Sequence, residues 1–179
     1  MQLDLSEIVM RKGMRTGFDL DEKGVEDPDL VFAAPVTGRL DFDNSGDLLN
    51  IRGRAETALS IACSRCLVDV RVPVRLQVEE HFPLDEVMHP NRPPGEDADF
   101  ESIVSSVVYL DQGKPILDLD ELLRQLIVTE VPLRTLCSDA CKGLCPHCGA
   151  NRNDTPCACV DEPHHTPLAG LAALLEKDQ

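Results

Sequence analysis

Hydrophobic and polar residues alternate most regularly between residues 68 and 78. Apolar side chains occupy every second position of this stretch: Val68, Val70, Val72, Val74, Leu76 and Val78. A period of two predicts a β-strand with one buried face and one solvent-exposed face. Pro73 falls on the exposed side and lacks a backbone N–H, which indicates an edge strand. Earlier apolar runs, separated by turn residues such as Asn44-Ser45-Gly46, predict further strands between residues 31 and 63.

The period becomes helical after residue 118. Apolar residues then recur at the spacing of one helix face: Leu119, Leu122, Leu123, Leu126 and Ile127. Asp118 and Glu121 have the spacing of an N-cap and its capping-box partner, and Pro132 ends the pattern. A helix is therefore predicted over residues 118–131. A second helix is predicted over residues 167–175, with Thr166 as its N-cap.

Other segments of the chain have weaker patterns. The first 30 residues are polar and poorly periodic, and one short element is expected there. Residues 83–101 combine four prolines with many acidic side chains. Such a composition cannot bury enough apolar surface to order itself, so we expect a flexible acidic loop. A short strand is predicted over residues 103–110.

The composition allows these elements to enclose a core of aliphatic side chains. The chain has 179 residues, of which 42% are hydrophobic and 3% aromatic. We predict an α+β fold with an antiparallel β-sheet domain and central helix over residues 1–131, and a small C-terminal cysteine-rich zinc module with its own helix over residues 132–179. The sequence contains no run of 18 apolar residues and no signal-peptide pattern, so we expect a cytoplasmic protein without a membrane partner.

Charge narrows the choice of partners. The net charge is −15, from 17 basic and 32 acidic residues, which favours basic partners over phosphate backbones in general. The charge is uneven, however, because residues 48–78 hold five arginines against two acidic residues, for a net charge of +3. Candidate RNA contacts in and around this stretch are Arg52, Arg54, Arg65 and Arg71. An ordinary solvated strand surface is the alternative.

The eight cysteines carry the clearest chemical signal. Two lie in Cys63-Ser64-Arg65-Cys66 at the end of a predicted strand, and six lie within residues 137–159 with the spacing C-x3-C-x3-C-x2-C-x8-C-x-C. The stretch Cys145-Pro146-His147-Cys148-Gly149 is typical of a zinc knuckle. Two thiolates at this spacing bind one ion only when the chain turns tightly, which proline and a glycine of positive φ favour. In a reducing cytoplasm, zinc is favoured over disulfides.

Eight cysteines could fill two sites, because tetrahedral zinc takes four ligands. The preferred partition places Cys145, Cys148, Cys157 and Cys159 on one ion, and Cys63, Cys66, Cys137 and Cys141 on a second. Alternatively, Cys137 or Cys141 completes the first site, and Cys63 and Cys66 remain thiols. Closed sites of this kind predict a structural metal, since catalytic zinc keeps an open position. The sequence also lacks G-x-S-x-G, P-loop and G-x-G-x-x-G motifs, so no enzyme activity is expected.

The order of these motifs resembles the YceD family over most of the chain. The resemblance lies in Cys63-Ser64-Arg65-Cys66-Leu67, the strand that ends in Val78-Glu79-Glu80-His81-Phe82, the helix that begins at Asp118-Leu119, the run from Leu136 to Asn151, and the closing helix. The family is named for the accumulation of the large-subunit (23S) ribosomal RNA. The resemblance therefore implies a role in large-subunit biogenesis or ribosomal RNA stability.

The resemblance and the composition together predict a non-enzymatic factor with structural zinc. Its expected partner is the precursor of the large ribosomal subunit, through ribosomal RNA, a basic ribosomal protein or both. Two other classes remain open at this point. One is a zinc-dependent protein-binding adaptor unrelated to ribosomes, and the other is a thiol switch at Cys63 and Cys66.

Overall fold

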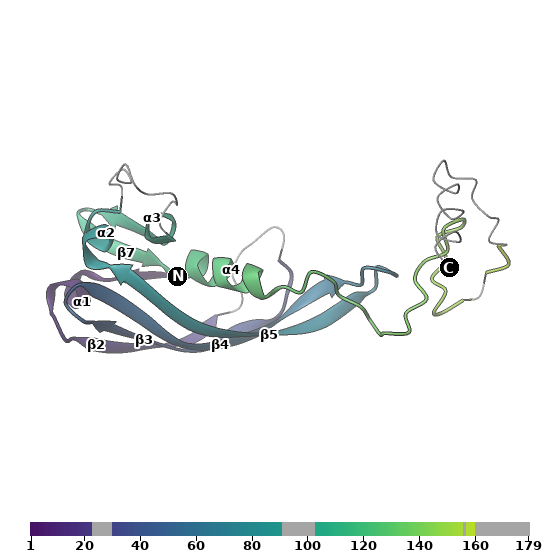
Figure 1. Cartoon of the computed structure of the whole chain (residues 1–179), viewed down its shortest axis with the longest axis horizontal. Helices are drawn as coiled ribbons and strands as arrows, with labels where there is room; N and C mark the ends of the chain where they lie inside the picture. The colour runs from purple at the N-terminus through teal and green to yellow at the C-terminus, as the bar shows by residue number, and fades with distance from the viewer. Residues whose placement is uncertain (23–29, 91–102, 156, 160–179) are drawn as a thin grey trace, which may run out of the picture.

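The computed structural model describes residues 1–22, 30–90, 103–155 and 157–159. These residues form an α+β fold with two antiparallel sheets, which confirms the predicted fold class. The molecule is elongated: a body of short strands and helices lies at one end, a long hairpin extends from it, and the cysteine-rich segment lies at the other end (Figure 1). The helix predicted over residues 167–175 lies outside the described residues.

The larger sheet contains four strands in the order β2-β3-β4-β5, each antiparallel to its neighbour. They are β2 (Arg15–Glu22), β3 (Phe32–Asn44), β4 (Leu48–Ala62) and β5 (Asp69–Pro83). β5 holds the alternating stretch and lies at the edge of the sheet, as Pro73 predicted. The turn between β3 and β4 is held by Asn44, whose side chain accepts from the N–H of Gly46 at 2.7 Å and donates to the carbonyl oxygen of Ile8 at 2.7 Å.

The smaller sheet has the order β1-β7-β6, and four helices accompany the two sheets in the described residues. Its strands are β1 (Gln2–Asp4), β6 (Val108–Asp111) and β7 (Lys114–Asp118). The helices are α1 (Ser6–Met10), α2 (Leu84–Met88), α3 (Ile103–Val107) and α4 (Leu119–Glu130). Because β1 pairs with β7, the first residues of the chain lie beside the start of α4.

Three local predictions were wrong in part. The first 22 residues contain three elements instead of one short element. The loop predicted over residues 83–101 begins with α2, which forms because Val87 is fully buried against the core. The strand predicted over residues 103–110 divides into α3 and β6, since Val104 and Val107 face the core at helical spacing. Residues 91–102 lie outside the described part of the chain.

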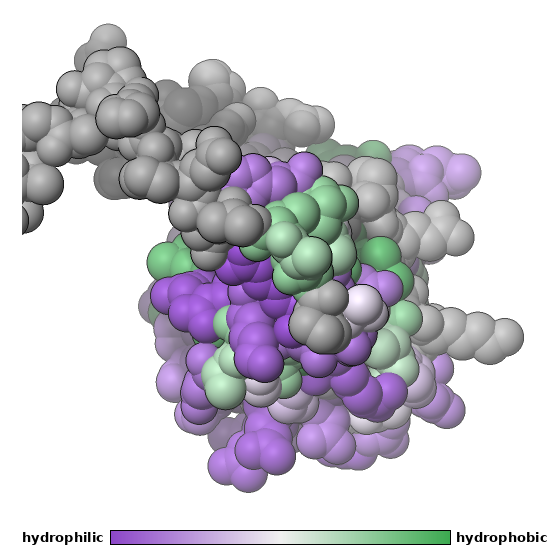
Figure 2. Space-filling view, turned by 90° about the vertical axis from the view of Figure 1, so that its right-hand side faces the viewer, coloured by the Kyte–Doolittle hydropathy of each residue, from purple (hydrophilic) through white to green (hydrophobic). Residues whose placement is uncertain are grey.

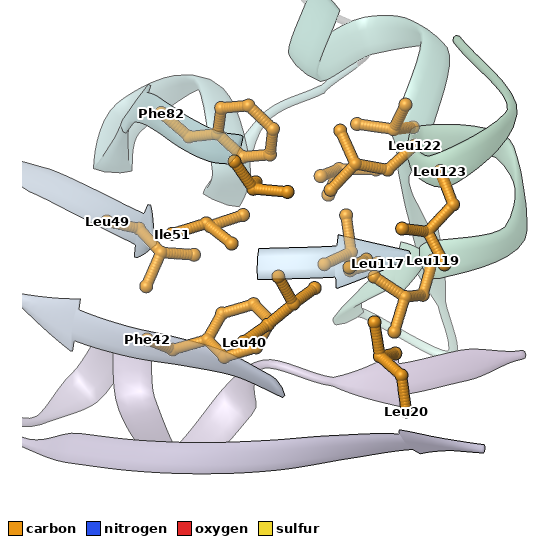
Figure 3. Close-up of a cluster of buried hydrophobic side chains, with 14 of the residues drawn as sticks. Leu20, Leu40, Phe42, Leu49, Ile51, Phe82, Leu117, Leu119, Leu122 and Leu123 are labelled. Atoms are coloured by element: carbon orange, nitrogen blue, oxygen red, sulfur yellow. The ribbon is translucent and has the colours of Figure 1, made fainter. Parts of the chain in front are cut away.

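The main core lies between the inner face of the larger sheet and a layer formed by α4 and the smaller sheet (Figure 3). The sheet contributes the fully buried side chains of Leu40, Phe42, Leu49, Ile51 and Phe82, and the opposite layer contributes those of Leu117, Leu119, Leu122 and Leu123. Alternation along β4 and β5 places these apolar residues on the inner face and the arginines on the outer face.

Asp118 caps α4, because its Oδ1 accepts a hydrogen bond from the N–H of Glu121 at 3.2 Å. The Glu121 carboxylate binds Arg124 and Gln125, and the Arg124 guanidinium lowers the pKa of Glu121 to about 2.

Replacing Asp118 with alanine is expected to lower the free energy of unfolding by about 1 kcal/mol. Urea unfolding measures this change. The variant Glu130→Ala, at the other end of the helix, is the control, and an equal loss in both variants would contradict the capping effect.

The β4–β5 hairpin extends beyond the body and carries Cys63 and Cys66 at its tip (Figure 1). After α4 the chain follows this hairpin to its end, where the N–H of Ser64 donates to the carbonyl oxygen of Thr135 at 2.8 Å. A second contact joins the N–H of Leu144 to the carbonyl oxygen of Arg65 at 3.1 Å. The hairpin thus brings the first pair of cysteines to the cysteine-rich segment.

Candidate metal centres

Four cysteines from distant parts of the chain meet at the hairpin tip, in a cluster that we call the bridging site. Its members are Cys63, Cys66, Cys137 and Cys141, and their sulfur atoms all lie within 4.8 Å of one another. The Sγ atoms of Cys66 and Cys137 are 3.6 Å apart, and those of Cys63 and Cys141 are 3.9 Å apart. Zinc–sulfur bonds of about 2.3 Å in a tetrahedron require sulfur–sulfur distances of about 3.8 Å. The cluster therefore fits a zinc ion.

Two backbone N–H groups, one from the hairpin turn and one from the segment after α4, point at the sulfur of Cys63. The N–H of Arg65 lies 3.5 Å from this sulfur, and that of Cys137 lies 3.4 Å from it. The Arg65 N–H is the main cause that lowers the pKa of Cys63 to about 6. The neighbouring Cys141 and Cys66 sulfurs raise the pKa of Cys137 to about 12. Thiols this close cannot all ionise without a cation between them, which is the condition that a bound metal would meet.

The other four cysteines form a second cluster, which we call the knuckle site. Its members are Cys145, Cys148, Cys157 and Cys159, with sulfur atoms within 4.8 Å of one another. The N–H groups of Cys148 and His147 lower the pKa of Cys145 to about 6, and the Cys148 sulfur raises the pKa of Cys159 to about 12. Cys145 is buried, whereas Cys148 and Cys159 are exposed. The donor set again suits zinc, at a more exposed position than the bridging site.

The two clusters begin with the same kind of turn. The N–H of Gly149 donates to the carbonyl oxygen of Cys145 at 2.9 Å, and the N–H of Leu67 donates to that of Cys63 at 2.9 Å. Gly149 has a φ of 71° and Leu67 a φ of 61°. The left-handed region costs a residue with a side chain roughly 1–2 kcal/mol, which explains why glycine is expected there. Because Leu67 stands where a knuckle turn usually has glycine, the sequence does not indicate that Cys63 and Cys66 form such a turn.

The membership of the two clusters is the same as in the preferred partition of the sequence analysis. Cys137 and Cys141 lie with Cys63 and Cys66. The alternative partition placed Cys137 or Cys141 in the knuckle site, but neither residue belongs to that cluster. The side chain of His147 is exposed. Binding of a metal to either cluster stays a prediction.

The bridging site lies in a small hydrophobic cluster of its own. Cys63, Cys66 and Cys141 are buried together and contact Val70, Leu136 and Leu144. This cluster is separate from the main core. Viewed from this end of the molecule, the surface is mostly hydrophilic, with smaller hydrophobic patches (Figure 2). Among the described residues, few apolar contacts therefore hold the cysteine-rich segment in place.

The four arginines predicted to contact RNA do not share one environment. Arg52 and Arg54 are exposed on the outer face of β4, and Arg71 lies on the same face of β5. Arg52 pairs loosely with Glu79 at 3.7 Å, and Arg71 donates to the carbonyl oxygen of Ala33 at 2.8 Å. Arg65 instead turns toward the bridging site and donates to the carbonyl oxygen of Cys141 at 2.9 Å. The structure thus groups three of the four arginines on one surface.

Sequence reasoning missed the polar residues that follow the knuckle turn. Asn151, Arg152 and Asn153 lie between Cys148 and Cys157, and side chains of this segment contact cysteines of both clusters. The Nδ2 atom of Asn153 lies 3.3 Å from the Sγ atom of Cys141 in the bridging site. The only signal in the sequence is Asn-x-Asn directly after Gly149-Ala150. Turn-forming asparagines are common in loops, so this pattern did not point to the cysteines.

None of the helices in the described residues is long and apolar enough to cross a membrane.

The fold and the two clusters together define a class: a β-sheet protein whose long hairpin shares a cysteine cluster with a C-terminal cysteine-rich segment. The family model described as "Large ribosomal RNA subunit accumulation protein YceD" matches residues 51–175, so the chain belongs to the YceD family. The matched range includes the β4–β5 hairpin tip, α4 and all eight cysteines.

Two plant proteins are similar to this chain, and both are described as "Large ribosomal RNA subunit accumulation protein YCED homolog 1, chloroplastic". The protein from Arabidopsis thaliana is 35% identical over 63 residues, which is 35% of this chain and 20% of the relative. The protein from Zea mays is 24% identical over 157 residues, which is 76% of this chain and 53% of the relative. The chain thus spans about half the length of the second relative and less of the first. No solved structure matches the chain.

Proposed function

We propose that the protein is a non-enzymatic factor in the biogenesis of the large ribosomal subunit, which supports the synthesis, processing or accumulation of 23S ribosomal RNA in the cytoplasm. The observation that carries the proposal is the family match over residues 51–175, because that family is described by the accumulation of the large ribosomal RNA subunit. The named plant relatives carry the same description. Their chloroplast location belongs to those proteins, and the cytoplasmic location is part of our proposal.

Zinc has a structural role in this proposal. Cys63, Cys66, Cys137 and Cys141 would hold one ion, and the four cysteines of the knuckle site would hold another. Four thiolates around each ion leave no open position for water, so the metals crosslink the chain and do not take part in a reaction. Each tetrathiolate zinc has a formal charge of −2, because four thiolates surround one divalent cation. This charge adds to the acidity of the module and disfavours nucleic-acid contacts close to the metals.

The outer face of the β4–β5 hairpin is the surface that best suits ribosomal RNA. Four arginines lie there with three acidic residues, in a chain whose net charge is −15: Arg52, Arg54, Arg71 and Arg75 against Glu56, Asp69 and Glu79. Arg54 lies directly across from Arg39 of β3. Like charges at cross-strand positions destabilise a sheet. Arg39 is neutralised by Asp19 at 2.9 Å and Asp41 at 3.2 Å, which leaves Arg54 as the cation that a phosphate would stabilise.

The remaining surface suits a basic ribosomal protein, because acidic residues outnumber basic ones by 32 to 17 in the whole chain. In this proposal the RNA and the basic protein would contact different faces of the molecule, so both could bind at once. A precursor particle offers both kinds of partner, and charge complementarity would guide each encounter.

Crosslinking in cells tests this function. We expect the protein to recover 23S ribosomal RNA, large-subunit proteins or both, and to co-sediment with precursors of the large subunit. Recovery of other proteins without ribosomal components would support an adaptor unrelated to ribosomes and overturn the proposal. A thiol switch at Cys63 and Cys66 would give a different result. Under mild oxidation the protein would then lose zinc, form disulfides and change its partners.

A further inference from the structure

Asn153 lies in the loop of the knuckle site but contacts a cysteine of the bridging site. Its Nδ2 donates to the Sγ atom of Cys141 at 3.3 Å. Its Oδ1 accepts a hydrogen bond from the backbone N–H of Lys142 at 2.8 Å. Because the Lys142 N–H can only donate, it fixes which end of the amide faces it and turns the Nδ2 group toward the sulfur. The contact with Cys141 is therefore oriented by the chain and does not depend on a free side-chain rotation.

A second asparagine holds Asn153 in this position. The Oδ1 atom of Asn151 accepts from the Nδ2 of Asn153 at 2.8 Å and from its backbone N–H at 3.0 Å. The Nδ2 of Asn151 in turn donates to Asp154 at 2.8 Å. Both hydrogens of the Asn153 amide thus have acceptors, one on the sulfur and one on Asn151. This network is built from three neighbouring residues of the loop between Cys148 and Cys157.

The loop is docked on the short linker between the two clusters. Only residues 142–144 separate Cys141 from Cys145. The N–H of Arg152 donates to the carbonyl oxygen of Gly143 at 2.9 Å, and the N–H of Cys145 donates to that of Ala150 at 2.8 Å. Cys148 and Cys157 lie on either side of the loop, so a metal in the knuckle site would close the loop and fix its ends. It would thereby also restrict the position of Asn153.

We propose that Asn153 couples the two metal sites, so that metal in the knuckle site strengthens metal binding in the bridging site. The proposal rests on the structural zinc of the proposed function. An N–H donor on a metal-bound thiolate stabilises its charge, and the loss of such a partner outside the coordination sphere typically costs 10- to 100-fold in metal affinity. Coupling between binding sites is reciprocal, so metal in the bridging site strengthens the knuckle site by the same factor.

Metal titrations on the full chain test the coupling. The probe is cadmium-113, whose resonance reports each tetrathiolate site separately, in competition with a chelator of known affinity. We expect Asn153→Ala to lower the affinity of the bridging site about 10-fold. Asn153→Asp is expected to lower it further, because a carboxylate oxygen replaces the donor beside the sulfur while the acceptor for Lys142 is kept. Thr155→Ala, at an exposed position of the same loop, is the matched control and is expected to leave the affinity unchanged.

A double-mutant cycle separates coupling from a local effect. The double variant Cys157→Ser and Cys159→Ser removes the knuckle site, and we expect it to weaken the bridging site by a similar factor. Adding Asn153→Ala to this variant is then expected to cause no further loss. An undiminished effect of Asn153→Ala in that background would overturn the coupling. So would no effect of Asn153→Ala in the otherwise wild-type chain with two metals bound. A wild-type protein that binds no metal would instead overturn the structural zinc on which the coupling rests.

Discussion

Removal of metal with a strong chelator is expected to unfold the cysteine-rich segment from residue 135 to 159 while both sheets and α4 persist. Bound zinc contributes on the order of 10 kcal/mol to the folding of such modules. In the part of the chain that the structure describes, the bridging site has only a small apolar cluster around it, namely Val70, Leu136, Leu144 and the cysteines themselves. The main core is separate and contains the large buried side chains of the sheets and α4. Metal loss thus removes the main support of one region only.

Hydrogen exchange measures this partial unfolding residue by residue. The N–H groups of Leu144, Cys145 and Arg152 are hydrogen-bonded in the structure and are expected to exchange slowly with metal and rapidly after chelation. Amides of β3 and β4 are expected to keep their protection, because their ladder does not depend on the cysteines. The metal content must be shown to be zero after chelation. Unchanged exchange of the Leu144, Cys145 and Arg152 amides in that metal-free protein would contradict the structural role of the metal.

A single substitution separates the two clusters within this experiment. Cys63→Ser removes one ligand at the hairpin tip and is expected to reduce bound zinc from two ions to one. The contacts of the tip with Thr135 and Leu144 are then expected to loosen. Ser64→Ala, at the neighbouring exposed position, is the matched control and is expected to retain both ions. Equal zinc content in the two variants would exclude Cys63 as a ligand.

The elements that could be predicted from the sequence are those whose pattern is local. β5 and α4 each place one face on the core and one face in solvent, so their periods of two and 3.6 appear directly in the residue order. The two cysteine groups were predicted for a similar reason, since a tight turn imposes the spacing of Cys145 and Cys148.

The elements that were missed depend on partners far along the chain. β1 is ordered by its pairing with β7, more than 100 residues later, and three residues alone carry no recognisable period. α3 resembles a strand in sequence because Ile103, Val104 and Val107 are β-branched, but the packing of its buried side chains favours a helix. Asn153 was missed because its contact with Cys141 exists only after the knuckle loop has docked on the linker.

Replacing Arg52, Arg54 and Arg71 together with glutamine is expected to weaken binding to a 23S ribosomal RNA precursor transcript on the order of 100-fold at low salt. These side chains lie on the outer face of the hairpin, where β4 and β5 run antiparallel over their full length. A phosphate backbone laid along this face would meet the arginines in succession. Each lost phosphate contact also reduces the salt dependence, by about 0.7 in the slope of log affinity against log salt for single strands. Fluorescence anisotropy over a range of salt concentrations measures both quantities.

The control must remove the same charge from basic residues that lie outside the hairpin and have acidic partners. Arg11, Lys114 and Arg124 meet this condition, since they pair with Glu7, with Asp4 and with Glu121. Substituting these three with glutamine changes the net charge of the chain by the same amount as the test variant does. A general electrostatic effect would therefore weaken both variants equally, whereas a specific contact on the hairpin weakens only the first. Equal losses would exclude this face as the RNA contact and leave a basic ribosomal protein as the partner that suits the acidic surface.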